Sequence, residues 1–246
     1  NHNIYGAFST PRVHLKYQPS SKSSVRVSAG KGYRTPYIFM DNSAILASSR
    51  ELSILEPIKA EEAWNAGVQI VRDFQFSSEH PASLIVDFYR TEFQNQVVAD
   101  MEQNSRQILL YNLKGKSFSN SAQVELETTV SRGFDATLAF RYNDVKRTYN
   151  DKLLDVPLNN KYKGLLVLSF SPVNSLWQYD FTAQYNGQSR LPQNLDHPTE
   201  YKLDSQSPGF FMLFAQVQRT FNNFEIYAGI ENIGDYRQSN PILAWQ

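Results

Sequence analysis

Two glutamates, Glu125 and Glu127, have the spacing in this sequence best suited to acid–base chemistry. They lie in a stretch that alternates apolar and polar residues, so on a β-strand their side chains would share one face about 7 Å apart. Two carboxylates at that separation can divide the roles of general acid and general base. No nucleophile or third polar group accompanies them, and we therefore interpret both as polar residues of a strand face.

The other reactive residue types form no recognisable site. His2, His14, His80 and His197 share no ligand spacing, and cysteine is absent, so neither a metal site nor a disulfide nor a thiolate nucleophile is expected. The glycines lack the spacing of a phosphate-binding loop, and no serine–histidine–acid order is apparent. The sequence predicts no catalytic residue, no metal and no cofactor, and it argues against an enzyme.

Composition narrows the class of protein further. The 24 basic and 24 acidic residues cancel, so the basic surface of a nucleic-acid-binding protein is not expected. Aromatic residues make up 13% of the chain, yet the mean hydropathy is -0.46. No apolar run approaches the roughly 20 residues that a membrane-spanning helix needs. A chain that is both aromatic and polar indicates alternation along strands.

Apolar side chains do recur at every second position, as strands with one apolar and one polar face require. Residues 177–188 keep this register throughout, and residues 121–131 and 134–143 repeat it. Ten strands are expected in all, beginning near Val13, Val25, Trp64, Leu84, Arg106, Phe134, Lys163, Trp177, Phe210 and Phe224, with residues 121–131 taken as the end of the Arg106 strand.

The connections between these strands alternate in length. Tight turns are expected at residues 20–21, 77–78, 132–133, 173–174 and 222–223, and longer excursions at residues 35–59, 150–160 and 189–208. Short periplasmic turns and long extracellular loops are typical of outer-membrane β-barrels. A soluble β-sandwich binding module would alternate in the same way and stays an alternative.

Aromatic residues favour the barrel. Tyr and Trp bracket the apolar stretches as membrane-interface girdles would, at Tyr17, Trp64, Tyr142, Trp177, Tyr179 and Tyr185. The polar faces would line a lumen, with five charged residues foremost: Asp87, Glu125, Glu127, Arg141 and Asp180. The predicted fold is therefore an all-β, antiparallel transmembrane β-barrel with about ten strands in this chain.

Three motifs carry a resemblance to a known family. They are GKGYRTP at residues 30–36, LEPIKAEEAWNAG at residues 55–67 and ENIGDYRQ at residues 231–238. In this order and spacing they resemble TonB-dependent outer-membrane receptors, whose barrel has twenty-two strands around an N-terminal plug. The resemblance implies that residues 1–246 form the C-terminal portion of such a barrel, strands twelve to twenty-one. The plug, the N-terminal strands and the last strand would lie outside this chain.

The same resemblance implies a function. The protein would import a scarce nutrient across the outer membrane, iron-siderophores or cobalamin first, with energy from the TonB–ExbB–ExbD complex acting through the plug. Expected partners are outer-membrane lipid, a small-molecule or metal-chelate ligand and, as a further option, a surface lipoprotein. A passive porin would share the alternation but would carry no plug, and it is kept as the other alternative.

Eight residues of the expected extracellular loops are the candidate ligand contacts, because such side chains can stack on or hydrogen-bond a bulky ligand. They are Tyr33, Arg34, Tyr37, Asn42, Asp196, His197, Tyr201 and Trp245. For the first two the alternative is that Pro36 ends strand pairing before a loop. Aromatic loop residues can equally anchor a protein at the membrane interface.

Overall fold

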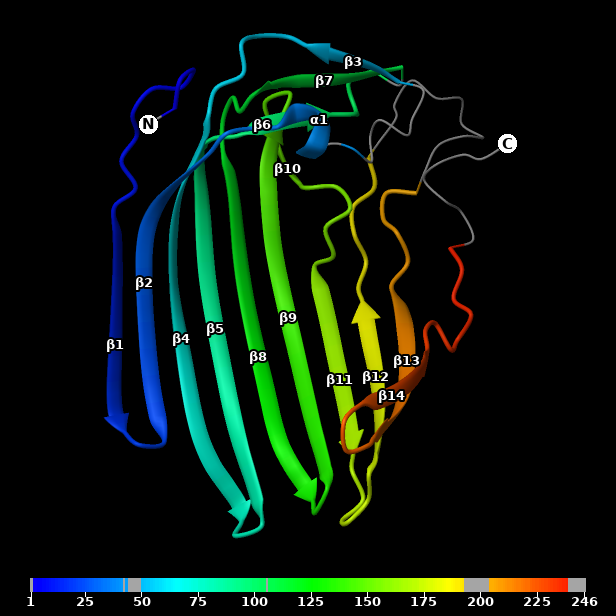
Figure 1. Cartoon of the computed structure of the whole chain (residues 1–246). Helices are drawn as coiled ribbons and strands as arrows, with labels where there is room; N and C mark the ends of the chain where they lie inside the picture. The colour runs from blue at the N-terminus through cyan, green and yellow to red at the C-terminus, as the bar shows by residue number, and fades with distance from the viewer. Residues whose placement is uncertain (1, 42, 44–49, 105, 193–203, 239–246) are drawn as a thin grey trace.

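The computed structural model describes residues 2–41, 43, 50–104, 106–192 and 204–238. One antiparallel sheet dominates, and its ten main strands lie side by side in chain order (Figure 1). They are β1 (Arg12–Ser20), β2 (Ser23–Arg34), β4 (Glu61–Ser77), β5 (His80–Asn95), β8 (Ser117–Ser131), β9 (Phe134–Tyr149), β11 (Tyr162–Phe170), β12 (Trp177–Asn186), β13 (Phe210–Thr220) and β14 (Glu225–Ile230). β1 and β14 are the two edges, so the sheet is an open wall.

Strand register separates the residues of this wall into an apolar face and a polar face. The leucines Leu84, Leu126, Leu138 and Leu166 face one another across four successive strands. Leu138 is 57% exposed and Phe140 51%, so in the described part of the chain no second layer covers the apolar face. A soluble sandwich would bury these side chains, whereas a barrel wall would turn them to lipid.

Aromatic residues gather at both ends of the apolar face. Tyr142 contacts Tyr162 near one end, and Phe134 contacts Phe170 near the other. The eight-residue separation of Tyr142 and Phe134 corresponds to about 26 Å along a strand. With the tilt of about 35–45° usual in outer-membrane barrels, a strand of that length covers about 20 Å of membrane thickness, most of the apolar band of about 25 Å that such barrels carry.

The connections segregate by length as expected. Short turns join the strands at one end, the turn end, and long segments join them at the other, the loop end (Figure 1). The loop end carries more structure than the sequence suggested: the short helix α1 (Ile38–Asp41) and the strands β3 (Glu51–Ile54), β6 (Val97–Asp100), β7 (Gln107–Asn112) and β10 (Lys152–Asp155). None of the described helices is long and apolar enough to cross a membrane.

The prediction of a single strand from about Arg106 to residue 131 was wrong. β7 ends at Asn112 in a separate sheet, and the wall strand β8 starts only at Ser117. Gly115 separates them with a φ of 118°, a conformation that residues with a Cβ rarely adopt. Residues 96–116 therefore form a fourth long connection, which local alternation alone did not reveal.

A second, small sheet joins the connection between β2 and β4 to the connection between β5 and β8. Its order is β3-β7-β6, with β3 parallel to β7 and β6 antiparallel to β7. The most buried side chains of the described chain belong to it: Ile108, Leu110, Val98 and Asp100. The hydrophobic core that the described residues form among themselves thus lies at the loop end, while the strands of the wall have few buried residues.

Candidate functional site

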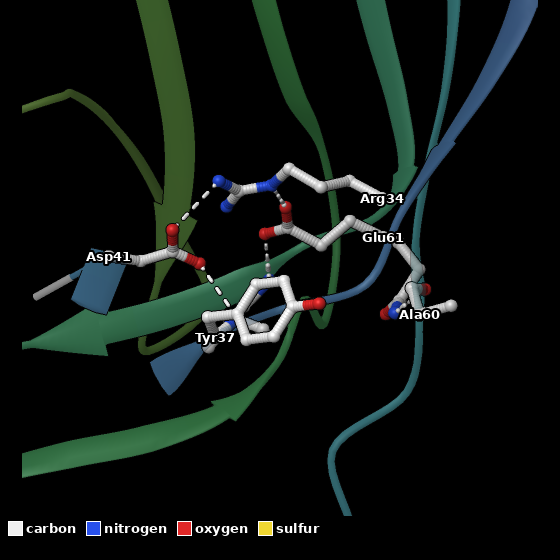
Figure 2. Close-up of polar contacts among 7 residues, drawn as sticks. Arg34, Tyr37, Asp41, Ala60 and Glu61 are labelled. Carbon is white, nitrogen blue, oxygen red and sulfur yellow. Dashed lines mark hydrogen bonds and ion pairs between the residues drawn. The ribbon is translucent and has the colours of Figure 1, made fainter. Parts of the chain in front are cut away.

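Arg34, Asp41 and Glu61 form an ion-paired cluster at the loop end, where the first long loop leaves β2 and returns to β4 (Figure 2). We call this cluster the bracket. Arg34, the last residue of β2, is paired in register with Glu61, the first residue of β4. The Arg34 Nε donates to Glu61 Oε2 at 2.5 Å, and its NH1 donates to Asp41 Oδ1 at 3.1 Å. The other Asp41 oxygen accepts the Tyr37 backbone N–H at 3.0 Å. One guanidinium therefore ties β4 and α1 to the end of β2.

Glu61 extends the bracket to the small sheet. Its side chain is buried, and Oε1 accepts the backbone N–H of Val97, the first residue of β6, at 3.0 Å. The neighbouring Asn95 side chain donates to the Ala60 carbonyl at 2.8 Å. Both Glu61 oxygens are thus occupied by donors from two different strands, and this role for Glu61 was not predicted from the sequence.

The predicted ligand contacts Tyr33 and Arg34 lie on opposite faces of β2. Tyr33 stacks on Phe8 with ring centroids 4.8 Å apart, and the Lys31 ammonium lies 5.1 Å from its ring centroid. Tyr37 is 63% exposed beside the bracket. Of the three, Arg34 and Tyr37 are brought together through Asp41, while Tyr33 belongs to the apolar face.

The remaining predicted ligand contacts, Asn42, Asp196, His197, Tyr201 and Trp245, lie outside the described residues. Within those residues, no group of three or more His, Asp or Glu side chains is arranged to hold a metal ion.

Asn112 fastens the first long loop to the small sheet. Its Oδ1 accepts the Lys59 N–H at 2.8 Å, and its Nδ2 donates to the Pro57 carbonyl at 2.9 Å. The Asn112 backbone N–H donates to Glu56 at 3.0 Å. The LEPIK segment of the second sequence motif is therefore held by the side chain and the backbone N–H of one residue from another connection.

A buried carboxylate organises the other end of the small sheet. Asp100 accepts the Tyr111 hydroxyl at 2.9 Å, the Gln103 amide at 2.8 Å and the Glu102 N–H at 2.9 Å. Burial, followed by the charge of Asp100 and its hydrogen bond, raises the pKa of the Tyr111 hydroxyl. The hydroxyl stays protonated and remains a donor.

Arg190 links three long connections. It forms an ion pair with Glu102 at 2.7 Å, with both side chains less than one-fifth exposed, and it donates to the Asp155 carbonyl at 3.1 Å. Asp155 in turn pairs with Lys161 at 2.8 Å, and this hydrogen bond raises the pKa of the Lys161 ammonium. Arg190 and Glu102 are 88 positions apart in the sequence, so this ion pair connects distant loops. We call the interconnected long connections of the loop end the cap.

The polar face carries one continuous row of side chains across seven strands. Strand register pairs them in the order Lys16, Arg26, Gln69, Asp87, Gln123, Arg141 and Lys163. We call this set the polar row. Gln69 donates to Asp87 at 2.9 Å and Arg141 donates to Gln123 at 2.7 Å. Among the described residues, no carboxylate pairs with any of its four cations, so the row holds three more positive than negative charges.

Acidic residues follow towards the turn end on the same face. Glu125 accepts from Gln123 at 3.0 Å, and Asp180 accepts from Ser169 at 2.6 Å. An open pocket of about 480 Å³ lies there, with Asp73, Glu127 and Asp135 among its lining residues. Register places all five predicted lumen residues on the polar face, although their contact with a lumen stays a prediction.

Sequence reasoning missed the residues that build the cap: Glu61, Asp100, Asn112 and Arg190. The partners of Glu61, Asn112 and Arg190 lie in other strands or connections, so no local spacing could identify these three residues. The partners of Asp100, namely Glu102, Gln103 and Tyr111, lie in its own connection. The run of two adjacent glutamates at the start of β4, Glu61 and Glu62, was the one available signal, because it puts one carboxylate on each face of the strand.

A family model described as "TonB dependent receptor-like, beta-barrel" matches residues 1–233. No curated protein matches the chain.

Solved structures share the fold at low sequence identity. A variant of the ferric enterobactin receptor of Pseudomonas aeruginosa superposes with a TM-score of 0.69 at 14% identity, over 96% of this chain and 36% of that one. The ferric-catecholate import receptor Fiu of E. coli K12 gives 0.60 at 11%, over 92% and 30%. The copper transporter OprC gives 0.67 at 12%, over 92% and 33%. The chain therefore spans about a third of the length of these proteins.

Proposed function

This chain belongs to the TonB dependent receptor-like β-barrel family, and from that premise we propose that it is part of a receptor that imports a ferric-siderophore chelate. The family places the chain in the bacterial outer membrane, where the apolar face meets lipid and the polar face meets the barrel lumen. The turn end then faces the periplasm and the loop end faces the outside.

We also propose that residues 1–246 form the C-terminal part of the barrel wall, with a plug and the remaining strands supplied by other residues of the receptor. In this arrangement the loops and the plug capture the ligand, and the TonB complex acts on the plug. The described residues contribute binding and shape, and no covalent step is assigned to them.

The observation that carries the substrate class is the polar row. Lys16, Arg26, Arg141 and Lys163 present four cations to the lumen without a paired carboxylate among the described residues. Such a band attracts a multiply charged anion and resists a cation, and the attraction weakens with salt. Ferric chelates of catecholate ligands are anions of this kind. The enterobactin and catecholate receptors with this fold are named for such ligands, which supports the proposal.

The test uses the full-length receptor in cells that lack other siderophore receptors. Uptake of an iron-labelled ferric catecholate should require both the receptor and an intact TonB complex. The double variant Arg26→Gln, Arg141→Gln should raise the half-saturating concentration by about tenfold, the ratio expected when two exposed charge interactions of about 0.7 kcal/mol each are lost. Arg72→Gln, which removes a cation from the apolar face near the turn end, serves as the matched control.

Three outcomes would contradict the proposal in different ways. Import of cobalamin instead of the chelate would overturn the substrate class alone. Uptake that continues without TonB would indicate a passive pore. An unchanged half-saturating concentration in the double variant would remove the polar row from ligand recognition.

A further inference from the structure

In the described part of the chain, the cations of the apolar face occur only near its two ends, and the two ends differ in whether each cation is paired with a carboxylate. Towards the loop end each cation has a carboxylate beside it on the same face. Lys31 pairs with Glu62, Arg90 pairs with Glu92 at 2.6 Å, and Lys146 lies 3.5 Å from Asp144. Towards the turn end the cations are Arg72 and Arg219, and in the described part of the chain neither pairs with a carboxylate.

Of these two arginines, Arg219 is the one that contacts aromatic rings. It lies opposite Trp177 in the register of β12 and β13 and shares the apolar face with Val217. Its guanidinium carbon is 5.0 Å from the Trp177 ring centroid and 4.9 Å from that of Phe221, in the turn to β14. Two rings therefore flank an exposed guanidinium in the aromatic girdle of the turn end.

This arrangement leaves the N–H groups of Arg219 without an acceptor among the described residues. The rings interact with the guanidinium through its π-faces and its charge, whereas its N–H donors point outward in its plane. Arg72, by contrast, donates to the Ser23 hydroxyl. In a membrane, a cation at the edge of the hydrocarbon layer extends towards the headgroups, where phosphate oxygens are the available acceptors.

We propose that Arg219, held between Trp177 and Phe221, binds the phosphate of a phospholipid headgroup in the periplasmic leaflet. The planar fork of an arginine matches two phosphate oxygens, and the flanking rings keep it oriented at low entropic cost. The paired cations of the loop end need no such ligand, because Glu62, Glu92 and Asp144 already balance them. This site is independent of the imported ligand and rests only on the orientation of the wall in the membrane.

The proposal predicts that one tightly held phospholipid depends on Arg219. The full-length receptor in a mild detergent is titrated with dioleoyl phosphatidylglycerol, and bound lipids are counted by native mass spectrometry. In Arg219→Gln the tightest phospholipid should bind about five- to tenfold more weakly, the loss expected for one charge-assisted, two-point contact. Arg90→Gln is the matched control, because Arg90 also lies on the apolar face, 4.9 Å from the Phe118 ring centroid, but is paired with Glu92. It should bind like the wild type.

Two further arms separate the headgroup from other ligands. Dioleoylglycerol, which lacks the phosphate, should not occupy the site, and inorganic phosphate at the same concentration should not displace the phospholipid. The proposal is overturned if Arg219→Gln retains wild-type affinity, if dioleoylglycerol binds as tightly as the phospholipid, or if inorganic phosphate competes. A heat-modifiable band on a gel establishes that each variant keeps its barrel, so a loss of lipid cannot be ascribed to misfolding.

Discussion

Replacing Glu61 with alanine should loosen the small sheet while leaving the wall intact. The substitution removes the acceptor of the Val97 N–H, which costs about 1 kcal/mol for a partly buried backbone donor. It also removes the ion pair with Arg34, but the Arg34 side chain is 58% exposed, so water compensates and the loss is about 1 kcal/mol at most. The two losses sum to about 2 kcal/mol.

That free energy should appear as faster local opening of the small sheet. About 2 kcal/mol corresponds to a roughly 30-fold increase in the open population. Hydrogen exchange measured by mass spectrometry on the full-length receptor should show peptides covering β6 and β7 exchanging about 30-fold faster, while peptides of β8 and β9 keep their protection.

Glu62→Ala is the matched control for this experiment. Glu62 is the next residue along β4, but it lies on the apolar face and pairs with Lys31, away from β6. Its loss should leave exchange in the small sheet unchanged. If Glu61→Ala exchanges like the wild type, or if Glu62→Ala opens the small sheet equally, the bracket does not hold the loop as described.

Three other substitutions probe the cap and the wall. Tyr111→Phe should weaken the small sheet by about 1 kcal/mol, because Asp100 keeps only two of its three donors. Because the pKa of Tyr111 is raised in the folded protein, the unfolded chain loses the hydroxyl proton first, so the stability that Tyr111 contributes should persist below about pH 10 and fall as the pH rises further. The difference in tyrosinate absorbance between the wild type and the variant would follow this loss. Arg190→Ala should make limited proteolysis of the long connections several-fold faster, since it separates Glu102 from the Asp155 carbonyl, whereas the exposed Arg237→Ala should not. Gly67→Ala should lower the unfolding temperature in detergent, because a Cβ there meets the Tyr89 ring and overpacking costs about 1–3 kcal/mol; at Gly32 the space is open, so Gly32→Ala should change the temperature little.

The wall was predictable because its signal is local. Each wall strand shows apolar residues at every second position, and antiparallel neighbours joined by short turns need no long-range information. The positions of Asp87, Glu125 and Arg141 on one face followed from parity alone.

The cap was not predictable for the opposite reason. β3 has four residues and pairs in parallel with a strand more than fifty residues away, from Glu51 to Gln107. Such short strands carry no periodicity, and their partners are fixed only by tertiary contacts such as Glu61 with Val97 and Arg190 with Glu102. The segment from Arg106 onward alternates well enough to be mistaken for the start of β8. In the structure β7 ends at Asn112 and pairs in another sheet, and Gly115, with its positive φ, lies in the break before β8.

In a barrel wall, adjacent residues of one strand face lipid and lumen in turn. Single spin labels at Leu126 and Glu127 of the full-length receptor, reconstituted in lipid bilayers, test this arrangement most directly. The label at Leu126 should collide with oxygen dissolved in the hydrocarbon layer and be shielded from a water-soluble nickel chelate. The label at Glu127 should show little access to oxygen. Equal access of both labels to the nickel chelate would contradict the barrel wall, and so would a reversal of the two accessibilities.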